Sequence, residues 1–395
     1  MDCIRNVVDM GRCFSCGGCV SACPKDAITM LYNENEGFFR PYINDDMCIS
    51  CGRCRQYCPS LHPSKTSLIG SFTKIFLVHS SNPTVRHWST SGGVINSFVR
   101  YLLNEKKVDC VLLTKHDTDS AIEATAVEIT SKNLKIMETE PREFASRYVC
   151  VPVLSRIKDL RKKYTSFAVV GTPCQIKALK LQCPDVFGLG VTCSGGMSYL
   201  ATSTYKKMQK YDEAQMYYRG DGWPGKNSLF NKKGSIEFTH NGSLFEQMFS
   251  SQIFKNPGCH SCQDHFAEMA DVSFCDFWNA EEQKNEVEGN SCVIIRSSIA
   301  AEIFDNMVKK GYVEIAKSLS EEDVINTQIR VLKDKKGNLR ETRAYKLYMS
   351  FANFIFKHKI YRFFNYDTYK FLCRIYKKCC NTANVNVTVI TGREK

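Results

Sequence analysis

Residues 13–24 read CFSCGGCVSACP and residues 48–59 read CISCGRCRQYCP, so one cysteine pattern occurs twice, 35 positions apart. In each copy three cysteines stand at intervals of three, a fourth follows four positions later, and a proline comes directly after it. Bacterial-type 4Fe-4S modules have this spacing, because a tight loop places three thiolates on one cubane while the fourth cysteine reaches the other cubane. The repeated pattern predicts two 4Fe-4S clusters in a small N-terminal module, and hence the transfer of single electrons.

Because the fourth cysteine of each run reaches the cluster of the other run, the eight cysteines divide into two sets. One cluster is predicted to take Cys13, Cys16, Cys19 and Cys58, and the second to take Cys48, Cys51, Cys54 and Cys23. Zinc knuckles and a disulfide framework are the competing interpretations, but zinc sites rarely use four-cysteine runs closed by proline. Between the two runs, residues 27–31 and 38–43 predict a short hairpin that covers the clusters.

The length and composition describe a globular protein with more than one unit. A chain of 395 residues is too long for one ordinary core, so we expect a small module and one or two larger α/β units. Residues 1–10 lack the apolar core of a signal peptide, and no stretch reaches the ~18 uninterrupted apolar residues of a membrane span, which predicts a cytoplasmic protein. In such a chain, 21 cysteines predict thiols and metal ligands rather than disulfides.

The formal net charge of +12 favours acidic partners. An acidic donor protein, a phosphorylated substrate and an anionic membrane face all satisfy this charge. No sequence feature supports binding of nucleic acid.

Beyond a linker predicted at residues 60–73, which are rich in Ser, Pro and Thr, the pattern is that of an α/β body. Residues 94–102 have helical spacing, and the clearest strands are residues 74–79, 108–114, 166–170, 187–191 and 270–278. In open α/β sheets ligands gather at the carboxyl ends of strands. Candidate site residues are therefore sought where these strands end.

Four cysteines of the body are candidates for a third metal centre. Cys174 follows the strand at 166–170, with Thr172 as N-cap and Pro173 as first helical residue, so the helix dipole is expected to favour its thiolate. Cys193 follows the strand at 187–191 and is expected to open a helix that runs to about residue 211; Cys259 and Cys262 form a CxxC pair. Buried cysteine is also a good small hydrophobe, which is the simpler interpretation of Cys110, Cys150, Cys183, Cys292 and Cys373.

Together these features resemble the coenzyme F420 hydrogenase/dehydrogenase beta-subunit family, a group of iron-sulfur flavoproteins. The resemblance covers about residues 74–298. The stretches that carry it, in the family's order, are Ser89–Gly93, Ala145–Tyr148, Gly171–Lys177, and Cys259–x–x–Cys262 leading to Ala270–Ser273.

The resemblance implies FAD in the α/β body, a nearby 4Fe-4S cluster, and hydride exchange between the flavin and an organic partner. Ser91, Gly92 and Gly93 match the family's flavin loop, and Arg147 and Lys177 become candidates to neutralise flavin or substrate charge. A solvated surface position is the alternative for either basic residue. The stretch at 218–223 is expected to form a lid near the substrate.

Two departures from the family pattern affect the site. Ser194 stands where members usually have histidine after the cysteine, and Cys275 stands where glycine usually precedes aspartate. Cys193 and Cys275 are therefore rival fourth ligands of the third cluster. No catalytic residue is assigned. Asp271, Asp276 and His260 are candidates for a general acid, but each is more readily interpreted as a structural residue.

The C-terminal residues 343–378 are basic and aromatic, which predicts helices that pack one face on the core, with docking on an anionic membrane as the minority interpretation. The predicted organisation is an α+β ferredoxin-like module at 1–65, an α/β flavin-binding body at 66–335 and a helical tail at 336–395. Its predicted function is that of a ferredoxin- or F420-linked flavin-dependent oxidoreductase with a soluble ferredoxin or other redox partner and a small organic substrate. The alternatives are an electron-transfer subunit of a larger redox complex and a non-redox scaffold with structural clusters.

Overall fold

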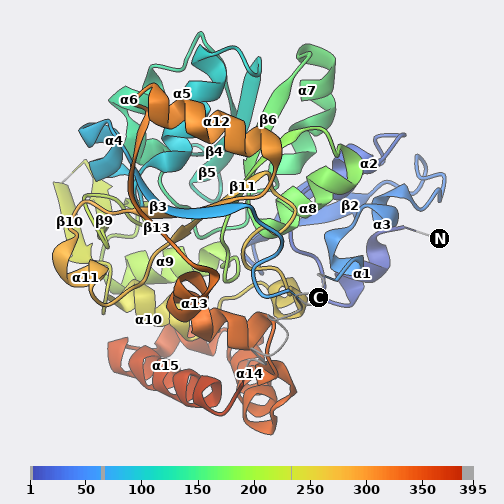
Figure 1. Ribbon diagram of the computed structural model, residues 1–395. Helices are drawn as coiled ribbons and strands as arrows, with labels where there is room; N and C mark the ends of the chain where they lie inside the picture. The colour runs from blue at the N-terminus through green and yellow to red at the C-terminus, as the bar shows by residue number, and fades with distance from the viewer. Residues whose placement is uncertain (1–2, 64–66, 233, 385–395) are drawn as a thin grey trace, which may run out of the picture.

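The computed structural model describes residues 3–63, 67–232 and 234–384. Figure 1 shows a central sheet with helices on both faces, the N-terminal segment beside it in blue, and the C-terminal helices below it in red. The mixed α/β character agrees with the sequence prediction.

The N-terminal segment is small and built around one hairpin. Its elements are α1 (Arg5–Asp9), α2 (Gly18–Ala22), β1 (Ile28–Asn33), β2 (Phe38–Ile43), α3 (Arg53–Gln56) and the 3-10 turn η1 (Pro59–Leu61). β1 and β2 pair antiparallel, with Ile28 opposite Ile43, as the hairpin prediction required. Gly17 and Gly52 occupy equivalent positions before α2 and α3 with φ of +81° and +73°, a conformation that glycine adopts without steric cost.

The central sheet has eight strands in the order β13-β3-β12-β11-β7-β6-β4-β5. Their bounds are β3 (Lys74–Ser80), β4 (Cys110–His116), β5 (Ala124–Ile129), β6 (Phe167–Gly171), β7 (Phe187–Val191), β11 (Val272–Asp276), β12 (Ser291–Ile295) and β13 (Val313–Ser318). The inner strands β11, β7, β6 and β4 run parallel, and β5 and β12 flank them antiparallel. The carboxyl ends of β3, β4, β6, β7 and β11 therefore meet at one edge, where ligands of such sheets bind.

Helices cover both faces of this sheet (Figure 1). Their bounds are α4 (Pro83–Trp88), α5 (Val94–Asn104), α6 (Ile136–Thr139), α7 (Ile157–Lys163), α8 (Pro173–Gln182), α9 (Tyr199–Met208), α10 (Leu244–Ser250), α11 (Glu282–Asn285), α12 (Ser298–Lys309) and α13 (Glu321–Lys335). On one face α5 and α12 pack through side chains such as Phe98 and Phe304, and on the other α13 packs through Val324 and Leu332. A separate antiparallel sheet holds β8 (Gln215–Tyr217), β9 (Lys226–Asn231) and β10 (Gly234–Thr239).

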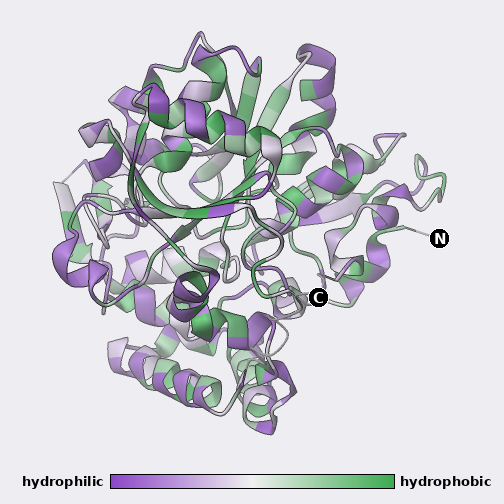
Figure 2. Ribbon diagram, viewed as in Figure 1, coloured by the Kyte–Doolittle hydropathy of each residue, from purple (hydrophilic) through white to green (hydrophobic). Residues whose placement is uncertain are grey.

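Two C-terminal helices, α14 (Arg343–Lys357) and α15 (Tyr366–Asn381), lie beyond α13 and are joined by the 3-10 turn η6 (Ile360–Phe363). Figure 2 shows apolar and polar residues alternating around both helices, whereas the strands of the central sheet are mostly apolar. In the described part of the chain, none of the helices combines the length and the apolar character that crossing a membrane requires.

The expected helix after β7 begins later than its sequence suggested. Residues 192–198 are not helical, and α9 starts only at Tyr199, where the Ser198 side chain accepts a hydrogen bond from the Leu200 N–H. The prediction that Cys193 opens a helix is therefore wrong. Hydrogen bonds to distant segments hold these residues out of the helix: the Cys193 N–H donates to His265 O, and the Met197 N–H donates to Tyr148 O.

The N-terminal module is docked on the body through backbone hydrogen bonds. Leu154 N–H donates to Cys16 O over 3.2 Å, and Tyr199 N–H donates to Gly37 O over 3.0 Å. Gly258 lies so close to Cys13 that a Cβ on this glycine would stand 2.5 Å from the Cys13 carbonyl oxygen. Such close packing fixes the cysteine loops of the module relative to the sheet edge.

Candidate functional site

The first cysteine set of the N-terminal module surrounds one cavity. It is lined by Cys13, Cys16, Cys19 and Cys58, together with apolar residues that include Ile4, Val7, Phe14 and Met30. Three of the cysteines come from the first run and one from the second. The fold thus brings together the four residues that the crossed spacing groups.

The chemistry of this cavity suits an iron-sulfur cluster. Burial raises the pKa of Cys16 to about 12 and that of Cys58 to about 11, so bare thiols here would keep their protons. A bound metal removes that proton outright. Backbone N–H groups reach the sulfurs: the Ser15 N–H donates to Cys13 Sγ over 3.4 Å, and such bonds stabilise clusters.

The second cysteine set ranges from buried to exposed. Cys23 and Cys54 are buried, Cys48 is partly buried, and Cys51 is exposed. Cys3 is buried beside Cys54, a neighbour that the spacing argument missed because it stands outside both runs.

In the body, four cysteines come together from separate segments. Cys174 lies in the first turn of α8, Cys193 follows β7, and Cys259 and Cys262 stand in and directly after the 3-10 turn η4 (Pro257–Ser261). The thiols of Cys259 and Cys262 are electrostatic neighbours of Cys193, and those of Cys193 and Cys259 are neighbours of Cys174. The Gly196 N–H donates to Cys259 Sγ over 3.4 Å, a contact of the kind seen in the module.

Burial corrects one expectation about Cys174. It raises the pKa of this thiol well above its usual value, and the nearby Cys16 thiol raises it further, so the helix start does not by itself yield a thiolate. The donor set of four buried or partly buried cysteines fits a metal cluster, which would supply the missing positive charge.

The rival ligand Cys275 points elsewhere. It lies opposite Cys292 in the β11–β12 pair, and both belong to the apolar cluster under α13. Cys150, interpreted from sequence as a simple core residue, instead neighbours Cys193 and Cys259, and its Sγ accepts a hydrogen bond from Asn256. The structure therefore places Cys193, with Cys150 as a fifth thiol, at the body's cysteine group.

Two buried lysines approach this group. Lys335, at the end of α13, is 4% exposed, and its Nζ lies 3.4 Å from Cys262 Sγ and 2.6 Å from Asp264 O. Lys177 has Asp264 and Cys262 among its electrostatic neighbours. Sequence analysis missed Lys335 because only the tertiary fold brings α13 to the cysteines.

The module and the body meet at their cysteines. Cys16 is the strongest electrostatic neighbour of Cys174. Around this point α2 packs on α8, where the Gln182 side chain donates to Gly18 O over 3.1 Å and Ser21 Oγ donates to Gln182 Oε1 over 2.9 Å. Cys54 of the second module set is an electrostatic neighbour of Cys19 in the first set, so the first set is linked both to the second set and to the body's cysteine group.

The predicted flavin loop lies between β3 and α5. Ser91 Oγ donates to Asn290 O over 2.8 Å, and the Gly92 N–H donates to Ser291 Oγ over 3.0 Å. A Cβ on Gly92 would stand 2.6 Å from Val78 O, and Gly93 has a φ of +73°. Packing at the sheet edge thus explains both glycines, and the amide of Gly92 is already used within the protein.

Beside this loop lie two arginines whose guanidinium groups are only partly hydrogen-bonded. Arg142 packs over the rings of Trp88 and Tyr217, and Arg147 packs over Tyr217 at 5.3 Å. Within the described residues the Nε atoms of both arginines are buried without a hydrogen-bond partner, and burial lowers the pKa of Arg147 to about 10. Such a pair fits an anionic group like the diphosphate of a dinucleotide.

The two basic residues predicted to contact flavin do not share one site. Tyr217, Tyr218 and Glu143 surround Arg147, whereas Lys177 lies near the body's cysteines. The loop and Arg147 are close, because the Ser146 N–H donates to Thr90 Oγ1 over 2.7 Å.

The segment expected to form a lid is buried. Arg219 is 2% exposed, forms an ion pair with Asp276, and lies over the rings of Trp223 and Trp278 at 5.0 and 5.3 Å. Its guanidinium also donates to Thr90 O over 2.9 Å. Arg219 therefore links the predicted flavin loop to the end of β11.

The remaining acid candidates have structural partners. Asp271 accepts hydrogen bonds from Lys180 Nζ and the Gly188 N–H, each over 2.8 Å. Burial lowers the pKa of His260 to about 3, which keeps its ring uncharged at neutral pH. Neither is poised to move a proton.

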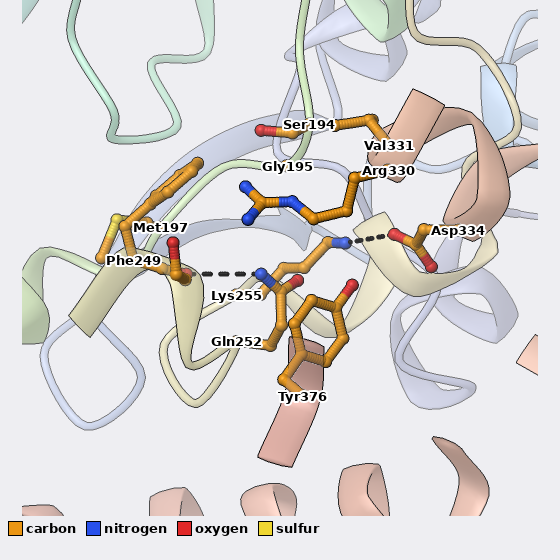
Figure 3. Close-up of a pocket in the computed structure, with 11 residues that line it drawn as sticks. Ser194, Gly195, Met197, Phe249, Gln252, Lys255, Arg330, Val331, Asp334 and Tyr376 are labelled. Carbon is orange, nitrogen blue, oxygen red and sulfur yellow. Dashed lines mark hydrogen bonds and ion pairs between the residues drawn. The ribbon is translucent and has the colours of Figure 1, made fainter. Parts of the chain in front are cut away.

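A second hollow opens beside the body's cysteine group (Figure 3). Ser194 and Gly195, which follow Cys193, form part of its wall. Figure 3 shows the Lys255 side chain pointing to Asp334, with the two charged atoms 3.0 Å apart, and Arg330 lying near them. The wall of this hollow mixes apolar side chains such as Met197 and Phe249 with the paired Lys255 and Asp334.

The fold and its cysteine groups define an iron-sulfur protein with an N-terminal dicluster module on an α/β body. The family model described as a 4Fe-4S dicluster domain matches residues 12–61. The models for the N-terminal and C-terminal parts of the coenzyme F420 hydrogenase/dehydrogenase beta subunit match residues 75–158 and 164–321. The chain belongs to this beta-subunit family, as the resemblance in its sequence implied.

Curated relatives are distant but extensive. The chain is 24% identical to a subunit of the F(420)H(2) dehydrogenase of Methanosarcina mazei over 332 residues, covering 76% of this chain and 84% of the relative. It is 21% identical to the beta subunit of the coenzyme F420 hydrogenase of Methanococcus voltae over 258 residues, covering 62% and 84%. Against the coenzyme F420-dependent sulfite reductase of Methanocaldococcus jannaschii it is 26% identical over 370 residues, which is 88% of this chain but only 53% of that protein.

A solved structure shares the fold. A chain of the F420-reducing [NiFe] hydrogenase complex from Methanosarcina barkeri superposes with a TM-score of 0.52 at 17% identity, covering 71% of this chain and 96% of that chain. At this identity the likeness concerns the fold alone.

Proposed function

We propose that the chain is an iron-sulfur flavoprotein oxidoreductase, in which single electrons pass between the two module clusters, a third 4Fe-4S cluster in the body and FAD. The observation that supports the proposal is the electrostatic proximity of Cys16 to Cys174, at the place where α2 packs on α8. Bound FAD would exchange hydride with an organic substrate or deazaflavin coenzyme and single electrons with the clusters.

The proposed cluster ligands divide into three sets of four. The module sets are those given by the crossed spacing, and the body set is Cys174, Cys193, Cys259 and Cys262. Lys335 would hold positive charge beside the body set. Backbone N–H groups such as that of Gly196 would orient the sulfurs. Cys150 is an alternative ligand for this set.

For FAD, the proposed contacts are the loop at Ser91, Gly92 and Gly93 and the guanidinium of Arg147, with Arg142 added. The orphaned Nε atoms of the two arginines support a diphosphate at this place. The start of α5 directly after Gly93 adds free backbone amides of the kind that bind phosphate. Lys177 is reassigned from the flavin to the body's cysteine group.

For partners, we propose a redox protein that docks near the exposed Cys51. The relatives named above include subunits of hydrogenase and dehydrogenase, so a larger redox complex is the preferred form of that partner, with soluble ferredoxin as the alternative. The substrate of the complex would be a small organic molecule or deazaflavin coenzyme.

The test is anaerobic purification of the full chain, acid release and quantification of flavin, then mixing with reduced ferredoxin or reduced deazaflavin coenzyme. We expect about one FAD per chain and bleaching of the flavin by at least one donor. The Arg142→Ala/Arg147→Ala variant should lose most of the flavin, whereas the exposed control Arg156→Ala should keep it. Full iron without any flavin would reject the flavin part of the proposal and leave a pure electron-transfer subunit.

A further inference from the structure

The C-terminal helices expose an apolar stripe. Leu347, Phe351 and Phe354 on α14 are 63%, 52% and 53% exposed, and their spacing of four and three residues places them on one face of the helix. Phe363 in η6 is 88% exposed and Phe371 on α15 is 59% exposed. We refer to these five residues as the tail face.

The tail face is additional to the packing face of the same helices. On α14 the buried residues are Tyr345, Tyr348, Met349, Ala352 and Ile355, and on α15 they include Tyr369, Leu372 and Tyr376. These residues join the main hydrophobic core. The sequence prediction of a core-packing face is thus compatible with a second, outward aromatic face, which the described residues leave exposed.

The helices that carry the tail face are rich in positive charge. Residues 343–378 contain nine Lys and Arg residues and one Asp, in a chain whose formal net charge is +12. Among the described residues, no salt bridge involves any of these nine basic side chains; the Lys359 ammonium donates to the amide oxygen of Asn35, and Lys370 lies over the ring of Tyr366. The charge is therefore free to act on a partner outside the chain.

The tail helices combine exposed Phe and Leu side chains with Lys and Arg residues that form none of these salt bridges. This combination matches the interface of a bilayer with anionic lipids. The apolar side chains enter the boundary between headgroups and acyl chains, while the basic side chains attract the anionic headgroups. An acidic protein would satisfy the charges but would have to cover five apolar side chains spread over two helices and a turn. Figure 1 shows α14 and α15 as the outermost layer of the molecule on their side, where a flat surface can reach them.

We propose that the tail face docks this protein on the surface of a membrane that carries anionic lipids. The helices lie in the plane of the interface and do not cross it. The inference stands apart from the proposed redox function, because it uses no residue of the cysteine groups or of the flavin loop.

The experiment is co-sedimentation of the full-length, cluster-loaded protein with vesicles of phosphatidylcholine alone or with about one third phosphatidylglycerol. We expect binding to the anionic vesicles, little binding to the neutral ones, and a large loss of binding as NaCl rises from about 0.05 M to about 0.5 M. Equal binding to both vesicles, or none to either, would overturn the proposal.

Matched variants distinguish binding through the tail face from non-specific hydrophobic binding. Phe351→Ser/Phe354→Ser/Phe363→Ser should weaken binding by roughly tenfold or more. The control Val287→Ser/Ile299→Ser removes side chains that are 68% and 61% exposed elsewhere and should bind as the parent does. Unchanged iron content and thermal midpoint would show that each variant is folded.

A charge variant tests the electrostatic part. Lys357→Glu/Arg362→Glu/Arg374→Glu should abolish binding at low salt, whereas Lys162→Glu/Lys309→Glu, at exposed basic positions outside the tail, should reduce it little. Soluble poly-glutamate is the competing partner. If the chain binds poly-glutamate and not the anionic vesicles, the tail face is a protein-docking surface and the membrane proposal is wrong.

Discussion

The N-terminal module and the body gather cysteines in opposite ways. The module uses two short runs, each with its own loop and glycine, so its ligands lie close in sequence. The body draws Cys174, Cys193 and Cys259 from separate connections, and only the order of strands β6, β7 and β11 places them together. Motif spacing therefore identifies the first kind of site, and sheet topology creates the second.

Both regions place a cation near their sulfurs. In the module, Cys13 Sγ accepts a hydrogen bond from the Ser15 N–H, and the Arg40 guanidinium opposes the rise that burial causes in the pKa of the Cys13 thiol. In the body, the buried ammonium of Lys335 lies 3.4 Å from Cys262 Sγ. A cation stabilises the more negative, reduced form of a cluster, so removal of Lys335 should lower the potential of the proposed body cluster.

The largest expected effect tests the crossed ligands. Cys58→Ala, although it alters the second cysteine run, should remove the first cluster with about four irons per chain and interrupt transfer from the module to the body. Iron analysis and EPR of the dithionite-reduced protein measure it. Cys3→Ala, which removes a buried cysteine outside both runs, is the control and should keep all iron.

Loss of the proposed body cluster is the next largest effect. Cys174→Ala should lower the iron content by about four per chain and leave both module signals in the EPR spectrum. Cys275→Ala should leave the iron content unchanged, because Cys275 packs against Cys292. If Cys275→Ala loses iron and Cys174→Ala does not, the ligand set of the body is wrong.

Removal of the buried cation should shift a potential without removing iron. Lys335→Met should lower the midpoint potential of the proposed body cluster by roughly 65–130 mV, because a hydrogen bond from a charged donor contributes roughly 1.5–3 kcal/mol. EPR-monitored redox titration measures the shift, with Lys333→Met on the same helix as control. An equal shift in both variants would show that Lys335 does not act on the cluster.

The smallest effect concerns the junction of the two regions. Gly258→Ala places a Cβ 2.5 Å from the Cys13 carbonyl oxygen and should cost about 1–3 kcal/mol of unfolding free energy. Gly188→Ala, whose Cβ would meet its nearest atoms at an ordinary 3.5 Å, is the matched control. Denaturant unfolding of both variants measures the difference, and equal stabilities would contradict the close docking of module and body.

Much of the architecture could be predicted from local pattern. The strand at 187–191 and the helix start at Pro173 agree with β7 and α8, because apolar runs and capping residues act over a few neighbours. The helix expected from residue 192 fails because Cys193 and Met197 are held by hydrogen bonds to His265 and Tyr148, which lie far away in sequence.

The candidate site shows the same limit. The cysteines could be found because their residue type and spacing mark them, and the family resemblance added Ser91 to Gly93. Lys335 and Arg142 could not, since an isolated basic residue carries no sign of burial in the sequence. Their roles depend on contacts with Cys262 and with Trp88 and Tyr217 that only the folded chain makes.

The central claim, a relay of three clusters joined at Cys16 and Cys174, is tested most directly by iron and acid-labile sulfide analysis of the full chain purified without oxygen, together with Mössbauer spectroscopy. The account predicts about twelve irons and twelve sulfides per chain, all in 4Fe-4S clusters. About eight of each, with no spectroscopic change in Cys174→Ala, would contradict the third cluster and leave the module without a continuation into the body.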